Sequence, residues 1–243
     1  MGGGNGRDTT DDSRRAPRGR TNARGDATRE LILLTAERLF AERGIEAVPL
    51  RDIGVAAGQK NNVAVQYHFG DRESLVTAIA AYRADFMSDH LNEVVADLAS
   101  EAGPPTVEQV VRSFVRGLSR NLDEDNHFLP FISRYIIERG GYEGLDSTVP
   151  SSSIATMRII MLRLLPHLND ALLYERWQVL MTSAVHTLAR YQVAMRLQTL
   201  PGPLDDLVED LVHFLAAGLA SPVRSSDSRV RSSGRRPKSP TTP

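Results

Sequence analysis

The chain has 243 residues, 41% of them hydrophobic, and its formal net charge at pH 7 is -1. This length and apolar content suffice for a folded core, and the net charge argues against binding to nucleic acid by bulk charge alone. The chain has no cysteine, which excludes disulfides, thiolate metal sites and cysteine nucleophiles. No stretch approaches the roughly 18 apolar residues of a membrane span, and no apolar segment follows the N-terminal charges as in a signal peptide. We therefore expect a soluble, cytoplasmic protein without a membrane partner.

Both ends of the sequence are polar and rich in arginine. Residues 1–26 are mainly Gly, Arg, Asp and Thr, whereas residues 221–243 are mainly Ser, Arg and Pro. Segments of this composition bury too little apolar surface to offset the entropy cost of ordering. We therefore expect a disordered basic arm over 1–26 and a disordered basic tail over 221–243. The pattern leaves open whether the arm or the tail contacts DNA.

The first part of the chain shows helical spacing of apolar residues, interrupted by residues that begin or end helices. Gly44 and Gly58 are suited to follow a helix, and Pro49 is suited to its first turn. Asp71 has the side chain of an N-cap. The helices expected here cover residues 28–43, 50–57, 62–69 and 71 to about 98.

Helical spacing continues through the rest of the chain. The Gly, Pro and Ser residues over 140–153 predict a loop. The further helices expected are 106–122, 128–138, 152–165, 169–197 and 204–219. No alternation typical of strands is present, so the predicted fold class is all-α. We expect an N-terminal three-helix helix-turn-helix DNA-binding domain over 27–73 and a C-terminal helical ligand-binding and dimerisation bundle over 74–220.

Two short helices joined by a tight turn are the geometry of a helix-turn-helix, in which the later helix enters the major groove. The expected third helix carries polar side chains that can donate or accept hydrogen bonds, and Val65 and Phe69 would face the core. The small Ala64 would allow a close approach to the duplex. The residues expected to contact double-stranded DNA are Arg51, Asn61, Asn62, Val63, Ala64, Gln66, Tyr67, His68 and Arg72.

Residues 28 to 75 resemble the DNA-binding domain of the TetR family of transcriptional regulators. The resemblance lies in Thr28-Arg29-Glu30, Leu39-Phe40-Ala41-Glu42-Arg43-Gly44, Arg51-Asp52-Ile53, Ala57-Gly58, Tyr67-His68-Phe69-Gly70 and Arg72-Glu73-Ser74-Leu75. It implies a repressor-type dimer with each third helix in a major groove and a ligand pocket in the C-terminal bundle. The sequence departs from the family pattern in a turn over 59–62 that is one residue longer and in Gln66, where an aromatic residue is frequent.

By the same resemblance, Tyr67, His68 and Arg72 occupy positions that contact phosphate. The positions that read bases are occupied by Asn62, Val63, Ala64 and Gln66. Each assignment has an alternative: Tyr67 could seal the small core, His68 could cap or pack at a helix end, and Arg72 alone could be a solvated charge.

In the C-terminal part, the last two expected helices are unusually apolar, and the resemblance implies that they pair with their symmetry mates in a homodimer. An internal core is the alternative for part of these residues. The polar and aromatic residues that recur in apolar surroundings are candidates for a small-molecule effector pocket, although each could equally be an ordinary core or surface residue. They are His127, Arg134, Tyr135, Trp177, His186 and Tyr191. The effector itself is not identified by the sequence.

Two other functional classes fit the sequence less well. A di-metal carboxylate enzyme in a helical bundle needs two Glu-x-x-His pairs, but the chain has only Glu124 with His127, across an expected loop. Zinc-protease, nucleophile-elbow and phosphate-loop motifs are absent, so we expect no enzyme, no metal and no cofactor. A protein that coats DNA without sequence preference would need a basic folded domain, but acidic residues balance the basic ones between Arg29 and His90.

The sequence therefore predicts a sequence-specific DNA-binding transcriptional regulator, a ligand-responsive repressor that acts as a homodimer on a near-palindromic operator. It identifies neither the operator nor the regulated genes. Activation and repression use the same DNA-binding chemistry, so the sign of regulation is not encoded in these motifs.

Overall fold

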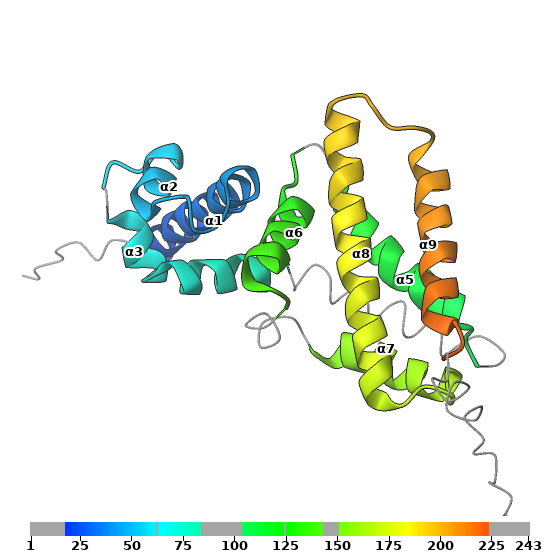
Figure 1. Ribbon diagram of the computed structural model, residues 1–243. Coiled ribbons are helices and arrows are strands. Elements are labelled where there is room, and N and C mark those ends of the chain that lie inside the picture. The colour runs from blue at the N-terminus through cyan, green and yellow to red at the C-terminus, as the bar shows by residue number, and fades with distance from the viewer. Residues whose placement is uncertain (1–17, 62, 84–103, 124, 143–150, 224–243) are drawn as a thin grey trace, which may run out of the picture.

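A computed structural model of the chain describes residues 18–61, 63–83, 104–123, 125–142 and 151–223 (Figure 1). Every regular element in these ranges is a helix, which confirms the all-α class. The helices are α1 (Arg18–Arg43), α2 (Leu50–Ala56), α3 (Ala64–Phe69), α5 (Val107–Ser119), α6 (Phe128–Arg139), α7 (Ser151–Leu164), α8 (Asp170–Arg196) and α9 (Leu204–Ala220). A further helix, here called the 72–83 helix, follows α3.

The largest difference from the predicted elements is at the start of α1. We expected the chain to be disordered up to residue 26, but α1 is helical from Arg18. Once the turns that contain Ile32 and Phe40 are fixed by burial, each added residue gains a hydrogen bond without a new nucleation cost. The predicted arm over 1–17, the end of the fourth helix beyond residue 83 and the tail from 224 lie outside the described residues.

The capping residues explain why the other helices begin where they do. The Oδ1 atom of Asp71 accepts a hydrogen bond from the Ser74 N–H at 2.8 Å, as its sequence position predicts. Thr106 and Gln109 form a reciprocal capping box at the start of α5. The side chain of Asn169 caps α8 by accepting from the Leu172 N–H at 2.8 Å.

The N-terminal helices share one apolar core. Phe40, Ile53, Val65 and Leu75 are each at most 1% exposed, and they come from α1, α2, α3 and the 72–83 helix. A Cβ atom placed on Gly54 of α2 would lie 3.5 Å from a methyl group of Val65, so glycine at this position lets α2 and α3 pack closely. This packing gives the short α3 a fixed position that its six residues alone could not maintain.

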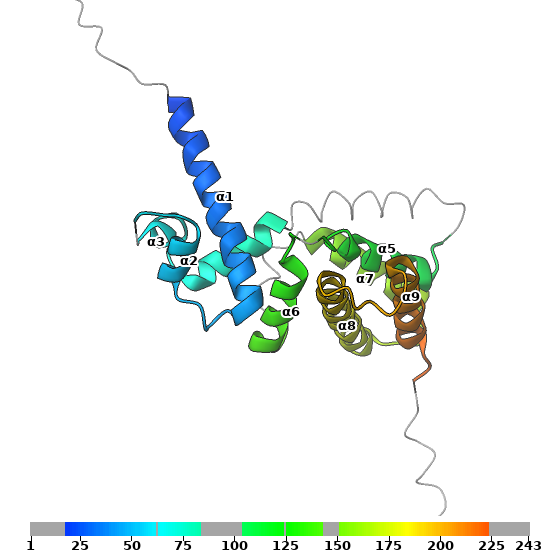
Figure 2. The same cartoon turned by 90° about the horizontal axis from the view of Figure 1, so that it is seen from above.

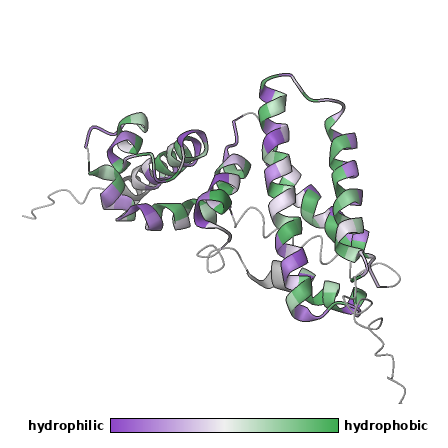
Figure 3. Cartoon of the chain, viewed as in Figure 1, coloured by the Kyte–Doolittle hydropathy of each residue, from purple (hydrophilic) through white to green (hydrophobic). Residues whose placement is uncertain are grey.

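The C-terminal helices α5, α7, α8 and α9 form a second packed unit (Figure 2). Trp177 of α8 lies against Phe114 of α5 with ring centroids 5.5 Å apart, and Met157 and Met161 of α7 are fully buried. Apolar and polar residues alternate along these helices, as the hydropathy colouring of Figure 3 shows. Each helix is therefore amphipathic and directs its apolar face inward.

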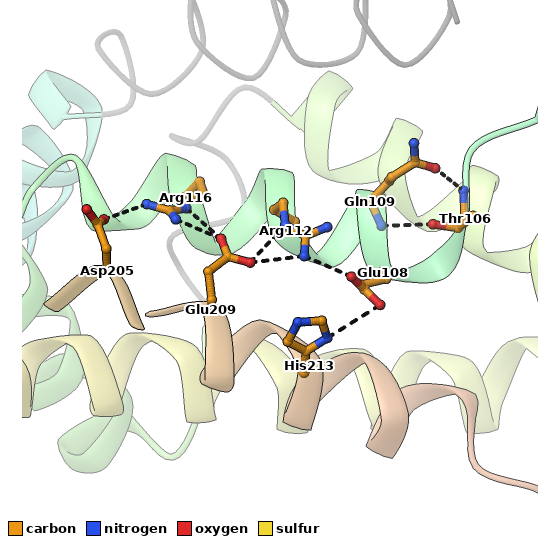
Figure 4. Close-up of polar contacts among 8 residues, drawn as sticks. All are labelled: Thr106, Glu108, Gln109, Arg112, Arg116, Asp205, Glu209 and His213. Atoms are coloured by element: carbon orange, nitrogen blue, oxygen red, sulfur yellow. Dashed lines mark hydrogen bonds and ion pairs between the residues drawn. The ribbon is translucent and has the colours of Figure 1, made fainter. Parts of the chain in front are cut away.

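Ion pairs join α5 to α9 on the outside of this unit (Figure 4). Arg112 and Arg116 both donate to the carboxylate of Glu209, at 3.0 and 2.7 Å for their closest pairs. Arg112 also donates to Glu108 and Arg116 to Asp205. Because two guanidinium groups converge on one carboxylate, the network fixes the register of the two helices.

Helix α6 lies between the two units and packs on α1 on one side and on α8 on the other (Figure 1). Phe131 of α6 stacks on Phe40 of α1 with ring centroids 6.3 Å apart, and both side chains are fully buried. On the other side, the hydroxyl of Ser133 lies 2.8 Å from Nδ1 of His186 on α8. The position of α1 is therefore determined by a helix that also belongs to the C-terminal bundle.

Candidate nucleic-acid interface

Helix α3 buries one face and exposes the other. Ala64, Val65 and Phe69 are buried in the N-terminal core, whereas Tyr67 is 84% exposed and Val63 is 51% exposed. Gln66 is also exposed. Positions 63, 66 and 67 are three and four residues apart, so they share one face of the helix. The exposed face thus offers an amide, a phenol and an apolar side chain, all suited to contact a duplex.

The C-terminal end of α3 is a cluster of rings. The rings of Tyr67 and His68 meet edge-on with centroids 5.2 Å apart. Phe69 is buried beneath the guanidinium of Arg29, which lies 4.9 Å from the ring centroid. The helix end is therefore supported by α1, while the Tyr67 hydroxyl remains available to an external partner.

The turn between α2 and α3 is held by its own side chains. Gly58 has φ of 66°, a left-handed conformation that favours glycine, and the Gln59 N–H donates to the Gly54 carbonyl at 2.9 Å. The Oδ1 atom of Asn61 accepts from the Val63 N–H at 3.1 Å. Asn61 therefore has a local role in positioning the start of α3, and Asn62 lies outside the described residues.

The two arginines expected at the DNA differ in their surroundings. The side chain of Arg51 is 73% exposed, with only Asp52 nearby at 3.6 Å. Arg72 instead donates from Nη1 to the carbonyls of Val48, at 2.8 Å, and of Ile45. Its guanidinium thus holds the connection between α1 and α2. Ala64, expected to approach the duplex, is buried.

A buried carboxylate that no sequence motif marks joins the N-terminal unit, made of α1, α2, α3 and the 72–83 helix, to α6. Glu37 of α1 is 2% exposed, and its two oxygens accept from Nε and Nη2 of Arg83, each at 2.7 Å. Oε1 of Glu37 also accepts from the backbone N–H of His127 at the start of α6, at 3.2 Å. Burial opposes the charge of Arg83, but the hydrogen bonds and charge of Glu37 outweigh it and raise the arginine pKa.

The other end of α6 contacts the turn after α1. The carboxylate of Glu138 accepts from the Ile45 N–H at 3.0 Å, and Arg139 pairs with Glu46 at 2.8 Å and with Glu73 at 2.5 Å. Both ends of α6 are thus bonded to the unit that carries α3. No sequence motif marks these contacts, because their partners lie more than sixty residues apart in the chain.

The residues expected in an effector pocket do not converge on one point. Trp177 and Tyr191 are both buried on α8 but fourteen residues apart, about 21 Å along a helix. Tyr135 is buried on α6, while His186 is exposed and contacts Ser133. Arg134 lies 3.9 Å from Glu138, and Nδ1 of His127 lies 3.2 Å from the Asp125 carbonyl.

Three buried polar groups of α8, on Trp177, Gln178 and Gln192, lack a hydrogen-bond partner within the described structure. The Nε1 atom of Trp177, on a side chain that is 2% exposed, has no acceptor. The Oε1 atom of Gln192 has no donor, although its Nε2 donates to the carbonyls of Asp123 and Asn126, each at 2.6 Å. An unpaired buried donor such as the Trp177 indole N–H costs about 1–3 kcal/mol, so it is suited to an acceptor on a bound molecule.

Within the described residues, no group of three or more His, Asp or Glu side chains is placed to hold a metal ion. In the same part of the chain, no helix is both long and apolar enough to cross a membrane.

Comparison with known proteins identifies the class. Residues 32–79 match the model of bacterial regulatory proteins of the tetR family, and residues 108–218 match a tetracycline repressor-like C-terminal domain. These two matches cover both units of the fold described above. The chain belongs to the TetR family, whose members regulate transcription and are not enzymes.

The curated relatives found match this chain over only part of its length. The HTH-type transcriptional repressor AcnR of Corynebacterium glutamicum is 39% identical over 66 residues, which are 27% of this chain and 35% of AcnR. The HTH-type transcriptional repressor BepR of Brucella suis is 38% identical over 72 residues, 30% of this chain and 34% of BepR. The chain thus spans about a third of the length of each of these relatives.

A solved structure extends the likeness in fold to the C-terminal unit. A putative TetR-family transcriptional regulator from Mesorhizobium loti superposes with a TM-score of 0.50 at 15% identity, covering 81% of this chain and 96% of that one. At this identity the likeness concerns the fold alone.

Proposed function

We propose that the chain is a ligand-responsive repressor that binds a near-palindromic operator in the cytoplasm as a homodimer, with one α3 in each major groove. The observation that carries the proposal is the division of α3 into a face packed on a fixed core and a face with Tyr67 84% exposed beside Gln66. A reading helix needs both properties, because base contacts require a fixed position and free polar groups.

Within this interface we assign different tasks to the exposed residues. Tyr67 and His68, at the end of α3, bind phosphate, and Arg51 approaches the backbone from α2. Val63 and Gln66 lie on the exposed face and meet base edges. Asn61 and Arg72 support the site through their bonds to the protein. For Arg72 to bind phosphate as well, its guanidinium must divide its N–H donors between the phosphate and the carbonyls of the 45–48 turn.

The dimer forms through α8 and α9. Phe214 of α9 is 73% exposed, and Ala217 and Gly218, three and four residues on, are exposed small residues that allow a close helix approach. Val179 on α8 and Leu197, which follows its last residue, are 65% and 66% exposed. Large apolar side chains at this exposure favour a covered surface, and a second copy of the chain is the partner that a palindromic site requires.

The effector binds beside Trp177, where an unpaired indole N–H faces apolar neighbours that include Phe114. This environment suits a hydrophobic molecule with one hydrogen-bond acceptor. The signal would pass through α6, because α6 packs on α8 and is bonded at both ends to the DNA-binding unit. The effector must bind the DNA-free arrangement more tightly than the DNA-bound one, since otherwise no population shifts.

The test is selection of bound duplexes from a random pool with the full chain, at stated salt, together with its mass in solution by sedimentation. We expect an inverted repeat to be enriched and the protein to be a dimer. The Phe214→Asp variant should sediment as a monomer and bind the repeat at least roughly tenfold more weakly, because one reading helix contacts too few base pairs. A folded dimer that enriches no sequence, with and without cell-derived small molecules, would contradict the proposal.

A further inference from the structure

The N-terminal unit has few positive charges to offer to phosphates. Residues 29–83 contain seven Arg or Lys residues and seven Asp or Glu residues. Arg38 and Arg83 form ion pairs with glutamates of α1, and Arg72 donates to backbone carbonyls. Because neutralisation of phosphates supplies a large share of most DNA affinities, a further cation close to α3 would contribute to binding.

Arg29, an exposed residue of α1, places such a cation against α3. Its guanidinium carbon lies over the ring of Phe69, the last residue of α3, at 4.9 Å from the ring centroid. Phe69 is packed in the apolar core and only 9% exposed, so its ring is a fixed support for the cation. The ring attracts the guanidinium through its π electrons and accepts no conventional hydrogen bond, which leaves the N–H donors available.

Among the described residues, no acidic group pairs with Arg29. The adjacent carboxylate, Glu30, accepts a hydrogen bond from the Tyr82 hydroxyl at 2.7 Å and is thereby directed toward the 72–83 helix. The Arg29 side chain itself has neither an ion pair nor a hydrogen bond within the part of the chain that the structure describes. Its charge is therefore open to an anion from outside the protein.

The side chains next to Phe69 are those to which we assign phosphate contacts. The centroid of the His68 ring lies 6.3 Å from that of Phe69, and the Tyr67 ring lies 5.2 Å from the His68 ring. The three aromatic side chains form a continuous cluster, and Arg29 adds a positive charge to it. Each DNA strand carries a phosphate about every 3.4 Å along the duplex axis, so a cluster of this extent meets adjacent phosphates of one strand.

We propose that Arg29 binds a DNA phosphate beside the C-terminal end of α3 and that Phe69 positions its guanidinium for this contact. The proposal rests on the proposed function. A guanidinium can donate two parallel N–H bonds to a phosphate, and such charged pairs are stronger than neutral hydrogen bonds. The contact is to the DNA backbone, so it strengthens binding to every sequence and adds no base preference.

The first experiment measures binding to the selected operator as a function of salt, for the full chain and for Arg29→Met. Methionine keeps an unbranched apolar side chain over Phe69 and removes the charge. The slope of log K against log salt should fall in magnitude by about 0.9 for each phosphate that is no longer neutralised, hence by about 2 for a dimer. The order of preference among operator variants should not change.

Two control variants test whether a charge at this position is responsible. Arg29→Lys keeps a cation and should retain the slope, although lysine lacks the planar fork of arginine and should bind more weakly. Arg43→Met removes the same charge from an exposed position fourteen residues further on in α1, about 21 Å along the helix, and should keep the original slope.

A double-mutant cycle tests the positioning role of Phe69. Phe69→Leu keeps an apolar side chain in the core and removes the ring. The affinity that this change costs should be roughly two- to fivefold larger per protomer in the unaltered chain than in the Arg29→Met variant, as for the loss of an exposed cation–π contact. Equal losses in the two backgrounds would show that Phe69 acts through the packing of α3 alone.

The outcomes separate the two proposals. If the unaltered chain selects an inverted repeat but Arg29→Met keeps its slope, Arg29 does not bind phosphate and the proposed function stands. If Arg29→Lys reduces the slope as much as Arg29→Met does, the variants act through local structure and not through charge, which also overturns the inference. If the unaltered chain selects no sequence, the proposed function itself has failed and the inference falls with it.

Discussion

The carboxylate of Glu138 lies against the backbone of Ile45, with its two oxygens 3.0 and 3.2 Å from the same N–H. Ile45 is fully buried and follows Gly44, whose φ of 98° turns the chain out of α1. A Cβ atom at Gly44 would lie 2.8 Å from Glu138 Oε1, so a larger residue there would be strained by its φ and would also displace this carboxylate. These contacts attach the last turn of α6 to the N-terminal unit.

Removing this carboxylate should destabilise the fold and loosen the contact between the two units. In Glu138→Ala the Ile45 N–H has no charged acceptor, and we expect a decrease of about 1–3 kcal/mol in the free energy of unfolding, measured by urea titration. The control is Ile137→Ala, because that neighbouring side chain is 63% exposed and should contribute less than about 0.5 kcal/mol. Equal decreases in the two variants would show that the contact does not matter.

Glu37 bonds α1 to the first turn of α6, as Glu138 bonds the last turn of α6 to Ile45, and its side chain is buried. Glu37→Gln leaves the Arg83 guanidinium without a counter-charge, and breaking a buried ion pair from one side costs about 3–5 kcal/mol. Glu42→Gln removes the exposed partner of Arg38 on the same helix and should cost less than about 1 kcal/mol. Urea unfolding compares the two variants, and a difference near zero would refute the role assigned to Glu37.

The two ends of α6 also show where sequence reasoning stops. The helix boundaries were predictable because Gly44, Asp71 and Gly140 act locally, through backbone conformation or a bond to a near neighbour. The role of Glu37 was not predictable, because its partner Arg83 is forty-six residues away and an isolated glutamate on a helix normally faces solvent. Contacts between near neighbours in the chain can be predicted from the sequence, whereas pairs of residues that the fold brings together cannot.

The candidate DNA interface divides in the same way. The exposure of Gln66 and Tyr67 followed from the buried spacing of Val65 and Phe69, so the reading face of α3 was predictable. The bonds of Arg72 to carbonyls were not, because a side chain that suits phosphate equally suits a backbone turn. The predicted effector residues were chosen by type alone, which cannot show that Trp177 and Tyr191 lie far apart on α8.

Acidic pH should weaken the ion pairs that connect α5 to α9, because it protonates the carboxylate of Glu209. Hydrogen bonds from Arg112 and then Arg116 lower the pKa of Glu209 below its ordinary value of about 4.3. A lowered folded-state pKa means that the stabilisation is complete above the unfolded-state value and is lost as the pH falls through the folded-state value. The Glu209 side chain is 33% exposed and its ion pairs lie at the surface, so the contribution should stay below about 1 kcal/mol.

The measurement is thermal unfolding between neutral pH and about pH 3, where glutamates in short peptides are mostly protonated. The Glu209→Gln variant should be less stable than the unaltered chain at neutral pH and should approach it as the pH falls. A constant difference across this range would mean that the ionised carboxylate is not what joins the helices.

The sharpest test of the reading face compares two adjacent side chains of α3. Both Gln66 and Tyr67 are exposed, so replacing either with alanine should leave the stability of the fold unchanged within about 0.5 kcal/mol. If Tyr67 binds phosphate as proposed, Tyr67→Ala should weaken binding to all operator variants nearly equally, by about 0.5–1.5 kcal/mol. If Gln66 contacts a base as proposed, Gln66→Ala should reduce discrimination at one base pair by about 1–3 kcal/mol. Competition binding against single-base operator variants separates the two effects, and an unchanged preference in Gln66→Ala would remove that residue from the set that reads bases.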